Sequence, residues 1–344
     1  MSAFPAAEIR DRLSAWWAFE DSGSPCILGS VCDGPLPDTE DLARFWQDEP
    51  FVIDRAMAVI NTSTYYGQAV PYHYVDQGSS AMAEVLGCPM RAVDKETVWA
   101  DACLKQAQQV LDIRFDPAAP CFRRIRRLTE ASCERAPGHH MVAPFALEGM
   151  TDLMAALYGL EPFLIDSLTQ PDLVARCLEH LKQIWLEAWS QIQSVINTGN
   201  PGGISWVGIW APGASFPLQE DVAYNLSPAA FERFCMPHIR DQVAAMEYPF
   251  FHVDGVGMIP HLDALLTIRE LKAIQWQPGA GKEDLAQWHD LLRKILAAGK
   301  SVQVYARAAE VKPLAAALGT RGVMAVITDA THENMQALMA NYRE

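Results

Sequence analysis

The pattern of apolar and polar residues in the second half of the chain predicts four short β-strands. Each is a run of about six residues rich in β-branched and aromatic side chains, followed by a segment with the apolar spacing of an amphipathic helix. The predicted strands are 249–254, 271–276, 301–306 and 323–328, and their first residues lie 22, 30 and 22 positions apart. That spacing holds one helix and two loops per unit, which is typical of a parallel sheet.

An earlier run, 204–210, predicts a fifth strand, and a helix begins soon after it. Ser227 has the position of an N-cap and Pro228 that of the first helical residue, and apolar residues follow at helical spacing. Five consecutive strand–helix units then extend over 204–341, and eight such units close into a barrel. We therefore predict an α/β protein with the fold of a (β/α)8 TIM barrel.

The first half of the chain has a weaker pattern. Apolar residues three and four positions apart over 151–196 predict helices, whereas 1–100 predicts a short helical start followed by aromatic loops. No segment rich in glycine, serine or charge separates two domains. We expect one domain over 1–344, with an N-terminal extension and the first elements in 1–100 and the main barrel in 101–344.

Composition fits a globular protein and narrows the range of partners. Half of the residues are hydrophobic, which is enough to form a packed core. The 27 lysines and arginines are outnumbered by 42 acidic residues, giving a net charge of −15 without a long basic run, so nucleic acid and anionic membranes are disfavoured. The eight cysteines form no C-x-x-C pair and are expected to be reduced thiols. With no signal-peptide or membrane-span pattern, we expect a cytoplasmic protein.

Polar residues gather where the predicted strands end, the place where TIM-barrel enzymes carry their reacting groups. His252 and Asp254 share one face of strand 249–254, because strand side chains alternate. A carboxylate at a barrel mouth has to be solvated, paired or metal-bound. One interpretation makes Asp254 a cap for the next element. The other, which we favour because two polar side chains point the same way, makes the pair a proton-handling or metal-binding centre.

Further candidates lie at neighbouring strand ends and in one long loop. Gln277, Tyr305 and Arg307 follow strands 271–276 and 301–306. The loop over 211–221 has only two charged residues, Glu220 and Asp221, which either contact a substrate or are solvated acids before a helix.

Tryptophans near the strand ends also allow two interpretations. They form an aromatic floor for a flat substrate or belong to the packed core, which is the commoner role of aromatic residues in strands. The three are Trp206, Trp210 and Trp276.

Several segments, taken in order, resemble a known superfamily. They are Glu148-Gly-Met-Thr-Asp152, Leu218-Gln-Glu-Asp221, Phe251-His-Val-Asp-Gly255, Ile274-Gln-Trp-Gln-Pro-Gly279 and Thr331-His-Glu-Asn334. Over about residues 90–341 the chain is similar to the uroporphyrinogen decarboxylase superfamily, in particular its corrinoid-dependent methyltransferase-like branch. The resemblance implies a (β/α)8 barrel with its site at the C-terminal mouth. It also implies either methyl transfer between a small molecule and cobalamin on a separate protein, or decarboxylation without a cofactor.

Two departures from the family pattern change the expected chemistry. The Arg-Gln-Ala-Gly-Arg motif of the tetrapyrrole decarboxylases is absent from the sequence, which disfavours a porphyrinogen substrate. Thiol methyltransferases of the superfamily bind zinc through His-x-Cys and a second Cys. Here Asp254 stands at the first Cys position, and Val326, Ile327 and Thr328 surround the second. His252 and Asp254 are therefore expected either to hold a harder zinc site or to act without metal.

We expect an enzyme that moves a methyl group from a small methoxylated or methylated compound to cobalamin on a corrinoid protein. The catalytic residues would be His252, Asp254 and Tyr305, with His252 and Asp254 as candidate zinc ligands. The substrate-binding residues would be Trp206, Trp210, Glu220, Asp221, Gln277 and Arg307. The alternative is a cofactor-independent decarboxylase or lyase of a small carboxylic acid, in which Arg307 binds the carboxylate. The substrate and the oligomeric state, a homodimer included, stay open.

Overall fold

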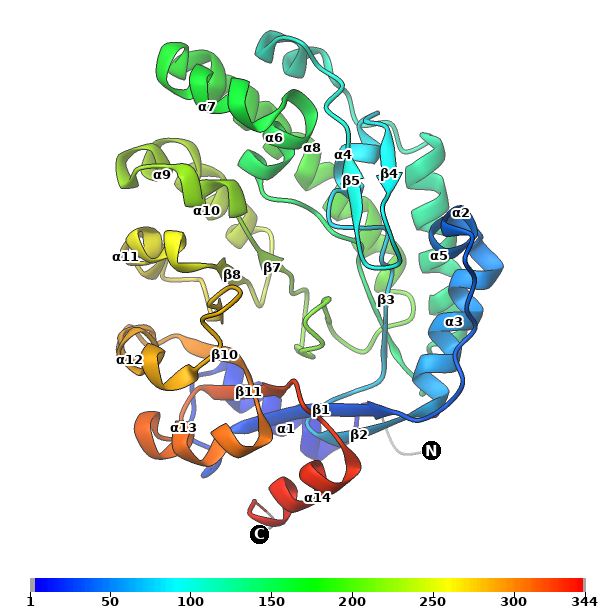
Figure 1. Cartoon of the computed structure of the whole chain (residues 1–344), viewed down its shortest axis with the longest axis vertical. Helices are drawn as coiled ribbons and strands as arrows, with labels where there is room; N and C mark the ends of the chain where they lie inside the picture. Colours follow the sequence, from blue (N-terminus) through cyan, green and yellow to red (C-terminus); the bar gives the residue numbers. More distant parts are fainter. Residues whose placement is uncertain (1–3, 343–344) are drawn as a thin grey trace.

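The computed structural model describes residues 4–342 as a mixed α/β fold, with many helices around a mostly parallel central sheet (Figure 1). The seven-stranded sheet has the order β2-β1-β11-β10-β9-β8-β7, and only β2 is antiparallel to its neighbour. Two further pairs are β3 with β6, parallel, and β4 with β5, antiparallel. The strands are β1 (Cys26–Cys32), β2 (Ser63–Gly67), β3 (Tyr72–Tyr74), β4 (Met90–Ala92), β5 (Val98–Ala100), β6 (Met141–Ala143), β7 (Pro217–Leu218), β8 (Phe250–Asp254), β9 (Ala273–Gln277), β10 (Ser301–Ala306) and β11 (Val323–Ile327).

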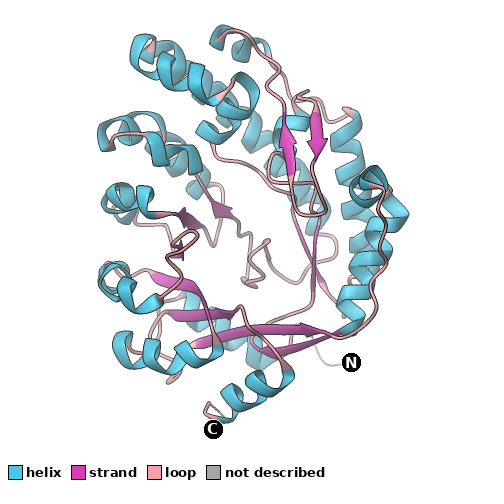
Figure 2. Cartoon of the chain, in the orientation of Figure 1, coloured by secondary structure: helices cyan, strands magenta, loops and turns pink. Residues whose placement is uncertain are grey.

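Helices lie on the outer side of the strands, which curve around a central region (Figure 2). Strands β7 to β11 are neighbours in chain order, and β1 pairs in parallel with β11, so the arrangement resembles that of a TIM barrel. The α-helices are α1 (Ala7–Trp17), α2 (Leu42–Gln47), α3 (Glu49–Thr62), α4 (Ala81–Val85), α5 (Pro120–Arg135), α6 (Met150–Tyr158), α7 (Leu160–Thr169), α8 (Pro171–Ile196), α9 (Pro228–Phe234), α10 (Met236–Ala244), α11 (Leu262–Leu266), α12 (His289–Ala297), α13 (Val311–Leu318) and α14 (His332–Ala340).

The four strands predicted in the second half are confirmed as β8 to β11; β8 starts one residue and β9 two residues later than predicted, and β10 and β11 start where predicted. The predicted helical stretch 151–196 is confirmed as α6, α7 and α8, and Pro171 opens α8. The helix expected from Pro228 begins there, because Ser227 accepts a hydrogen bond from the N–H of Ala230 at 3.2 Å. It is divided at Cys235 into α9 and α10, and Pro237 lies in the first turn of α10.

Two expectations are wrong. The run 204–210 is not a strand: Gly203 and Ala211 form an isolated antiparallel bridge, and Gly208 has φ +73°, so the segment folds back as a tight loop. The aromatic residues expected in loops at 65–74 lie largely in strands, with Tyr66 in β2 and Tyr72 in β3. The first hundred residues therefore contribute β1 and β2 to the central sheet.

Buried side chains form two cores, one on each face of the sheet. Alternate residues of one strand enter different cores: Phe250 packs in the inner core and Phe251 in the outer core, between sheet and helices. Leu28 and Met324 also belong to the inner core. Both faces of the sheet are thus apolar, as in parallel sheets generally.

Helix α1 covers the end of the inner core where the parallel strands begin. The indole N–H of Trp16 donates to the carbonyl of Gly322, just before β11, and that of Trp17 donates to the carbonyl of Trp210. The ring of Trp17 also packs edge-on against Phe250, the first residue of β8. Because this end is filled with apolar side chains, the opposite end, where the parallel strands finish, is left for polar groups.

None of the helices within 4–342 is both long enough and apolar enough to cross a membrane.

Candidate functional site

The polar side chains on the inner face of β8 and β9 lie toward the C-terminal ends of these strands. His252 and Asp254 come from β8, and the register places them opposite Gln275 and Gln277 of β9. Gln303 of β10 continues the row beyond Gln275. Since side chains alternate along a strand, all five residues share the inner face with Phe250. The inner core is therefore apolar at one end and polar at the other.

Gln275 fixes the protonation pattern of His252. The Nδ1 atom of His252 lies 2.5 Å from Oε1 of Gln275, and an amide oxygen only accepts, so Nδ1 carries the proton and donates it. The Nε2 atom then has a free lone pair. Burial lowers the pKa of His252, while Asp254 and Gln275 act in the opposite direction. The imidazole is thus held neutral, with Nε2 available as a base or a metal ligand.

Three atoms that could bind a metal ion lie close together here, and one of them is Nε2 of His252. Asp254 Oδ2 lies 4.0 Å from His252 Nε2, and a carboxylate oxygen of Asp221 completes a group whose atoms all lie within 4.8 Å of one another. One imidazole and two carboxylates are a ligand set that zinc accepts, with a fourth position left for a reactant. The residues present therefore fit a divalent cation.

Asp221 reaches the group because its loop is tied to α6 at two points. Glu220 accepts hydrogen bonds from the backbone N–H groups of Met150 and Thr151 at 2.9 and 2.8 Å, at the start of α6. In return Asp152 accepts from the N–H groups of Asp221 and Val222 at 3.0 and 2.7 Å.

A glycine allows this close approach of loop and helix. A Cβ on Gly149 would lie 2.1 Å from the carbonyl oxygen of Gln219, which is far inside van der Waals contact.

The predicted substrate-binding role of Glu220 is not supported by its surroundings. Its side chain is completely buried, and its role is to hold the loop.

Carboxyl groups gather here, and within residues 4–342 no lysine or arginine is among their hydrogen-bond or ion-pair partners. Burial raises the pKa of Glu220 to about 8, and the charge of Asp152 adds to the effect. The pKa of Asp221 is raised by loss of hydration and by the charges of Asp152, Asp254 and Glu220. Burial likewise raises the pKa of Glu148 to about 8. A bound cation would relieve this repulsion.

A cavity of about 530 Å³ opens beside His252. Its wall includes Trp206, whose ring packs edge-on against His252 with the ring centres 5.2 Å apart. Glu148 also lines it: this carboxyl is buried, its Oε2 accepts from the N–H of Met82 at 2.9 Å, and its Oε1 has no hydrogen-bond partner in the described part of the chain. The cavity therefore joins a candidate metal-binding imidazole to a carboxyl group that holds a proton at neutral pH.

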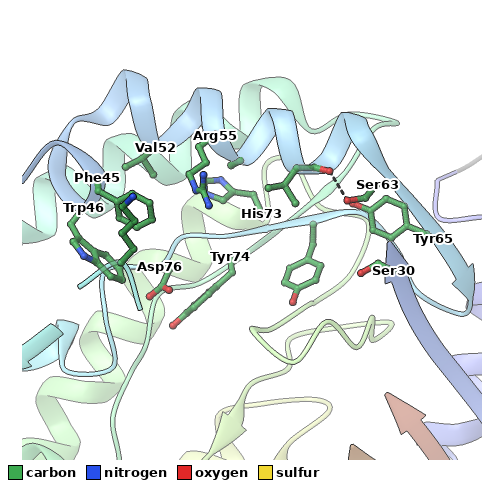
Figure 3. A pocket seen from close by; sticks show the side chains of 14 residues that line it. Ser30, Phe45, Trp46, Val52, Arg55, Ser63, Tyr65, His73, Tyr74 and Asp76 are labelled. Carbon is green, nitrogen blue, oxygen red and sulfur yellow. Dashed lines mark hydrogen bonds between the residues drawn. The ribbon is translucent and has the colours of Figure 1, made fainter. Parts of the chain in front are cut away.

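A second cavity, of about 390 Å³, adjoins the first, because Tyr74 and Asp76 line both. Figure 3 shows it beneath α3, with aromatic side chains on its wall and one arginine, Arg55, above them. The Arg55 guanidinium donates to the carbonyl of Pro37 and lies over the ring of Phe45. The aromatic residues of the lining are Phe45, Trp46, Tyr65, Tyr72 and Tyr74.

The structure brings together only part of the set predicted from sequence. Gln277 lies opposite Asp254 in the sheet, and Tyr305, half-buried on β10, is close to Gln275. Arg307 is not in this group: it pairs with Glu310 at 2.8 Å and its side chain is 65% exposed.

Two of the three tryptophans lie away from the cavities. Trp210 is buried in the inner core, where its indole N–H donates to the carbonyl of Pro201. Trp276 lies in the outer core against Trp288, so it does not face the inner side of the sheet. Of the predicted aromatic floor, only Trp206 lines the larger cavity.

Sequence reasoning assigned no site role to three residues that line or support the site. Gln275 has a signal in the alternation of β9, but its partnership with His252 depends on strand register. Glu148 immediately precedes the N-cap of α6, and although it opens a segment that carries the family resemblance, no site role was assigned to it. Tyr74 belongs to a three-residue strand, too short for a periodic pattern.

Comparisons with known proteins give a likeness of fold. No family model matches the sequence, and no curated protein matches it either. Among solved structures, a methyltransferase from Methanosarcina mazei superposes with a TM-score of 0.63, over 96% of this chain and 97% of the other, at 14% sequence identity. The chain therefore has a methyltransferase-like fold.

Proposed function

We propose that this protein is a methyltransferase that moves a methyl group from a small methoxylated or methylated compound to cobalamin carried by a corrinoid protein. The observation that supports this most is the group formed by His252, Asp254 and Asp221, at the open end of a fold shared with a methyltransferase. We further propose that the group binds zinc. A zinc ion there would supply Lewis acidity toward the heteroatom that carries the methyl group.

The residues of this chain have distinct tasks in the proposed reaction. Gln275 keeps the Nε2 lone pair of His252 free for the metal. Trp206 shields that imidazole from water on one side. The neutral carboxyl of Glu148 donates its proton to the heteroatom as the bond to methyl breaks, so that an alcohol or amine leaves instead of a strongly basic anion.

The finer description of the fold is also a proposal. The pairing of β1 with β11 brings the first and last parallel strands together, and the sheet has its two ends at β2 and β7. We infer that β3 and its partner β6 fill the interval between these ends and complete a (β/α)8 barrel; Figure 1 shows β3 on the opposite side of the central region from β8.

The alternative, a decarboxylase of a small acid, gains no support from the site. In that alternative Arg307 would bind the carboxylate of the substrate, but Arg307 forms an ion pair with Glu310. The carboxylates around His252 would repel an anionic substrate.

The test combines metal analysis with a transfer assay. We expect one zinc per chain in the wild type and none in His252→Ala. With methoxylated or methylated compounds and a reduced corrinoid protein, the cob(I)alamin spectrum should change to that of methylcobalamin. Arg307→Gln, outside the metal group, should keep both properties. Carbon dioxide released from a small acid without corrinoid would overturn the proposal in favour of the decarboxylase.

A further inference from the structure

A chain of hydrogen-bonded side chains leads from the tyrosine-lined cavity to the surface. His73 of β3 lines the 390 Å³ cavity, and its Nδ1 lies 2.9 Å from Oγ of Ser132 on α5. The same Oγ lies 3.1 Å from Nε2 of His140. The Nδ1 atoms of His140 and His139 are 3.0 Å apart, and Nε2 of His139 lies 3.0 Å from Oδ1 of Asn61 on α3.

The last acceptor determines where every proton of this chain lies. The amide oxygen of Asn61 only accepts, so His139 carries its proton on Nε2 and accepts at Nδ1. His140 must then donate from Nδ1 and accept at Nε2, where the Ser132 hydroxyl donates. Ser132 in turn accepts from Nδ1 of His73. Because the proton of His73 is on Nδ1, its Nε2 atom carries no proton.

The two ends of the chain differ in their contact with solvent. His73, Ser132 and His140 are buried, whereas His139 is exposed. Nε2 of His73 makes no hydrogen bond to the described part of the chain, and it is not among the polar atoms sealed from water. A free lone pair thus lies at the cavity end and an exposed imidazole at the surface end.

We propose that His73, Ser132, His140 and His139 form a proton path that carries a proton from a hydroxyl-bearing ligand in the tyrosine-lined cavity to solvent. The ligand's O–H bond breaks as its proton binds Nε2 of His73. The Nδ1 proton of His73 passes to Ser132, that of the serine hydroxyl to His140 Nε2, and that of His140 Nδ1 to His139. His139 then releases one proton to water. The ligand is left as an oxyanion, and no other reactant is needed.

The surroundings of the path disfavour a positive charge on the buried histidines, so a proton can pass through them but does not stay on them. Burial, followed by the charge of His140, lowers the pKa of His73 to about 4, and burial together with His139 lowers that of His140 to about 4. Arg135 of α5 also disfavours a charge on His140. A proton taken up at His73 is therefore not retained in the interior. This inference goes beyond methyl transfer and does not rest on it.

Nitrogen-15 NMR of histidine-labelled full-length protein tests the path, because it identifies which ring nitrogen carries the proton. We expect Nδ1–H at His73 and His140 and Nε2–H at His139 near neutral pH. When acid protonates His139 on Nδ1, His140 can no longer donate to it. The whole chain should then reverse, and His73 should change to Nε2–H in step with His139.

Variants separate a path from a purely structural network. Ser132→Ala should abolish the change of the His73 tautomer when acid is added. The surface substitution His139→Gln should abolish the same change, and it does not alter the core. Thr129→Val is the matched control, because Thr129 lies one turn away on α5 and its hydroxyl donates to the carbonyl of Ile125 in the same helix. A His73 tautomer that ignores the titration of His139 in the wild type, or one that still follows it in Ser132→Ala, would overturn the proposal.

Discussion

At the scale of single residues, the candidate site depends on a glutamine that holds a histidine. Gln275 is completely buried, its Oε1 accepts from His252, and its Nε2 has no hydrogen-bond partner among residues 4–342. Gln303, next to it on β10, is equally buried, but neither of its amide atoms has a hydrogen-bond partner among the residues the structure describes. The two glutamines are equally buried, and they differ in whether they form a hydrogen bond with the imidazole.

We predict that Gln275→Leu weakens zinc binding about 10–100-fold, the usual cost of losing the group that orients a metal-binding histidine. Titration with a zinc-sensitive competitor dye measures the affinity. Gln303→Leu is the matched control and should leave it unchanged. Equal losses in the two variants would mean that the glutamine row supports the fold and not the imidazole.

At the scale of elements, the site is assembled by one loop held between two helices. The loop that carries Asp221 is attached to α6 through Glu220 and Asp152, and its far side leads into α9. Ser227 caps α9 and so fixes where the loop ends. A substitution at this cap should therefore have a direct effect on stability and only an indirect effect on metal binding, through the position of the loop.

We predict that Ser227→Ala lowers the free energy of unfolding by about 1 kcal/mol, because the N–H of Ala230 loses its acceptor. Urea unfolding measures the change. Ser194→Ala serves as the control, since that exposed hydroxyl donates within α8 to the carbonyl of Gln191 and caps nothing. An unchanged midpoint for Ser227→Ala would contradict the assigned helix start.

At the scale of the whole molecule, the buried carboxyl groups at the polar end of the inner core make the folded state less stable as the pH rises. The pKa of Glu148 is raised to about 8 by burial, whereas in the unfolded chain it is about 4.3. Between these values the unfolded state loses its proton and the folded state keeps it. The folded state then binds more protons, so its stability falls with increasing pH across this window.

We predict that metal-free wild type loses stability relative to Glu148→Gln as the pH increases from about 5 to about 8, by a few kcal/mol. Unfolding by urea at several pH values gives the difference between the two proteins. Glu161→Gln, at an exposed position on α7, controls for the loss of a carboxyl. Parallel stability curves for wild type and Glu148→Gln would show that Glu148 is not a buried acid.

The sequence by itself determined the strand–helix repeat of the second half and the pair formed by His252 and Asp254. Both are local: strand alternation places two residues on one face, and a cap such as Ser227 acts within one turn. The same reasoning failed at 204–210, where strand-like side chains occupy a loop that Gly208 bends back.

Tertiary structure alone decided which face of each strand is the inside. Because residues on both faces of β9 are buried, alternation could not tell that Gln275 points inward and Trp276 outward. It also decided which distant residues meet: Asp221 joins His252 through a loop held by α6, and His73 reaches the surface through side chains of α5, α3 and the segment before β6. Such contacts depend on register and packing between elements far apart in the chain, which no local pattern records.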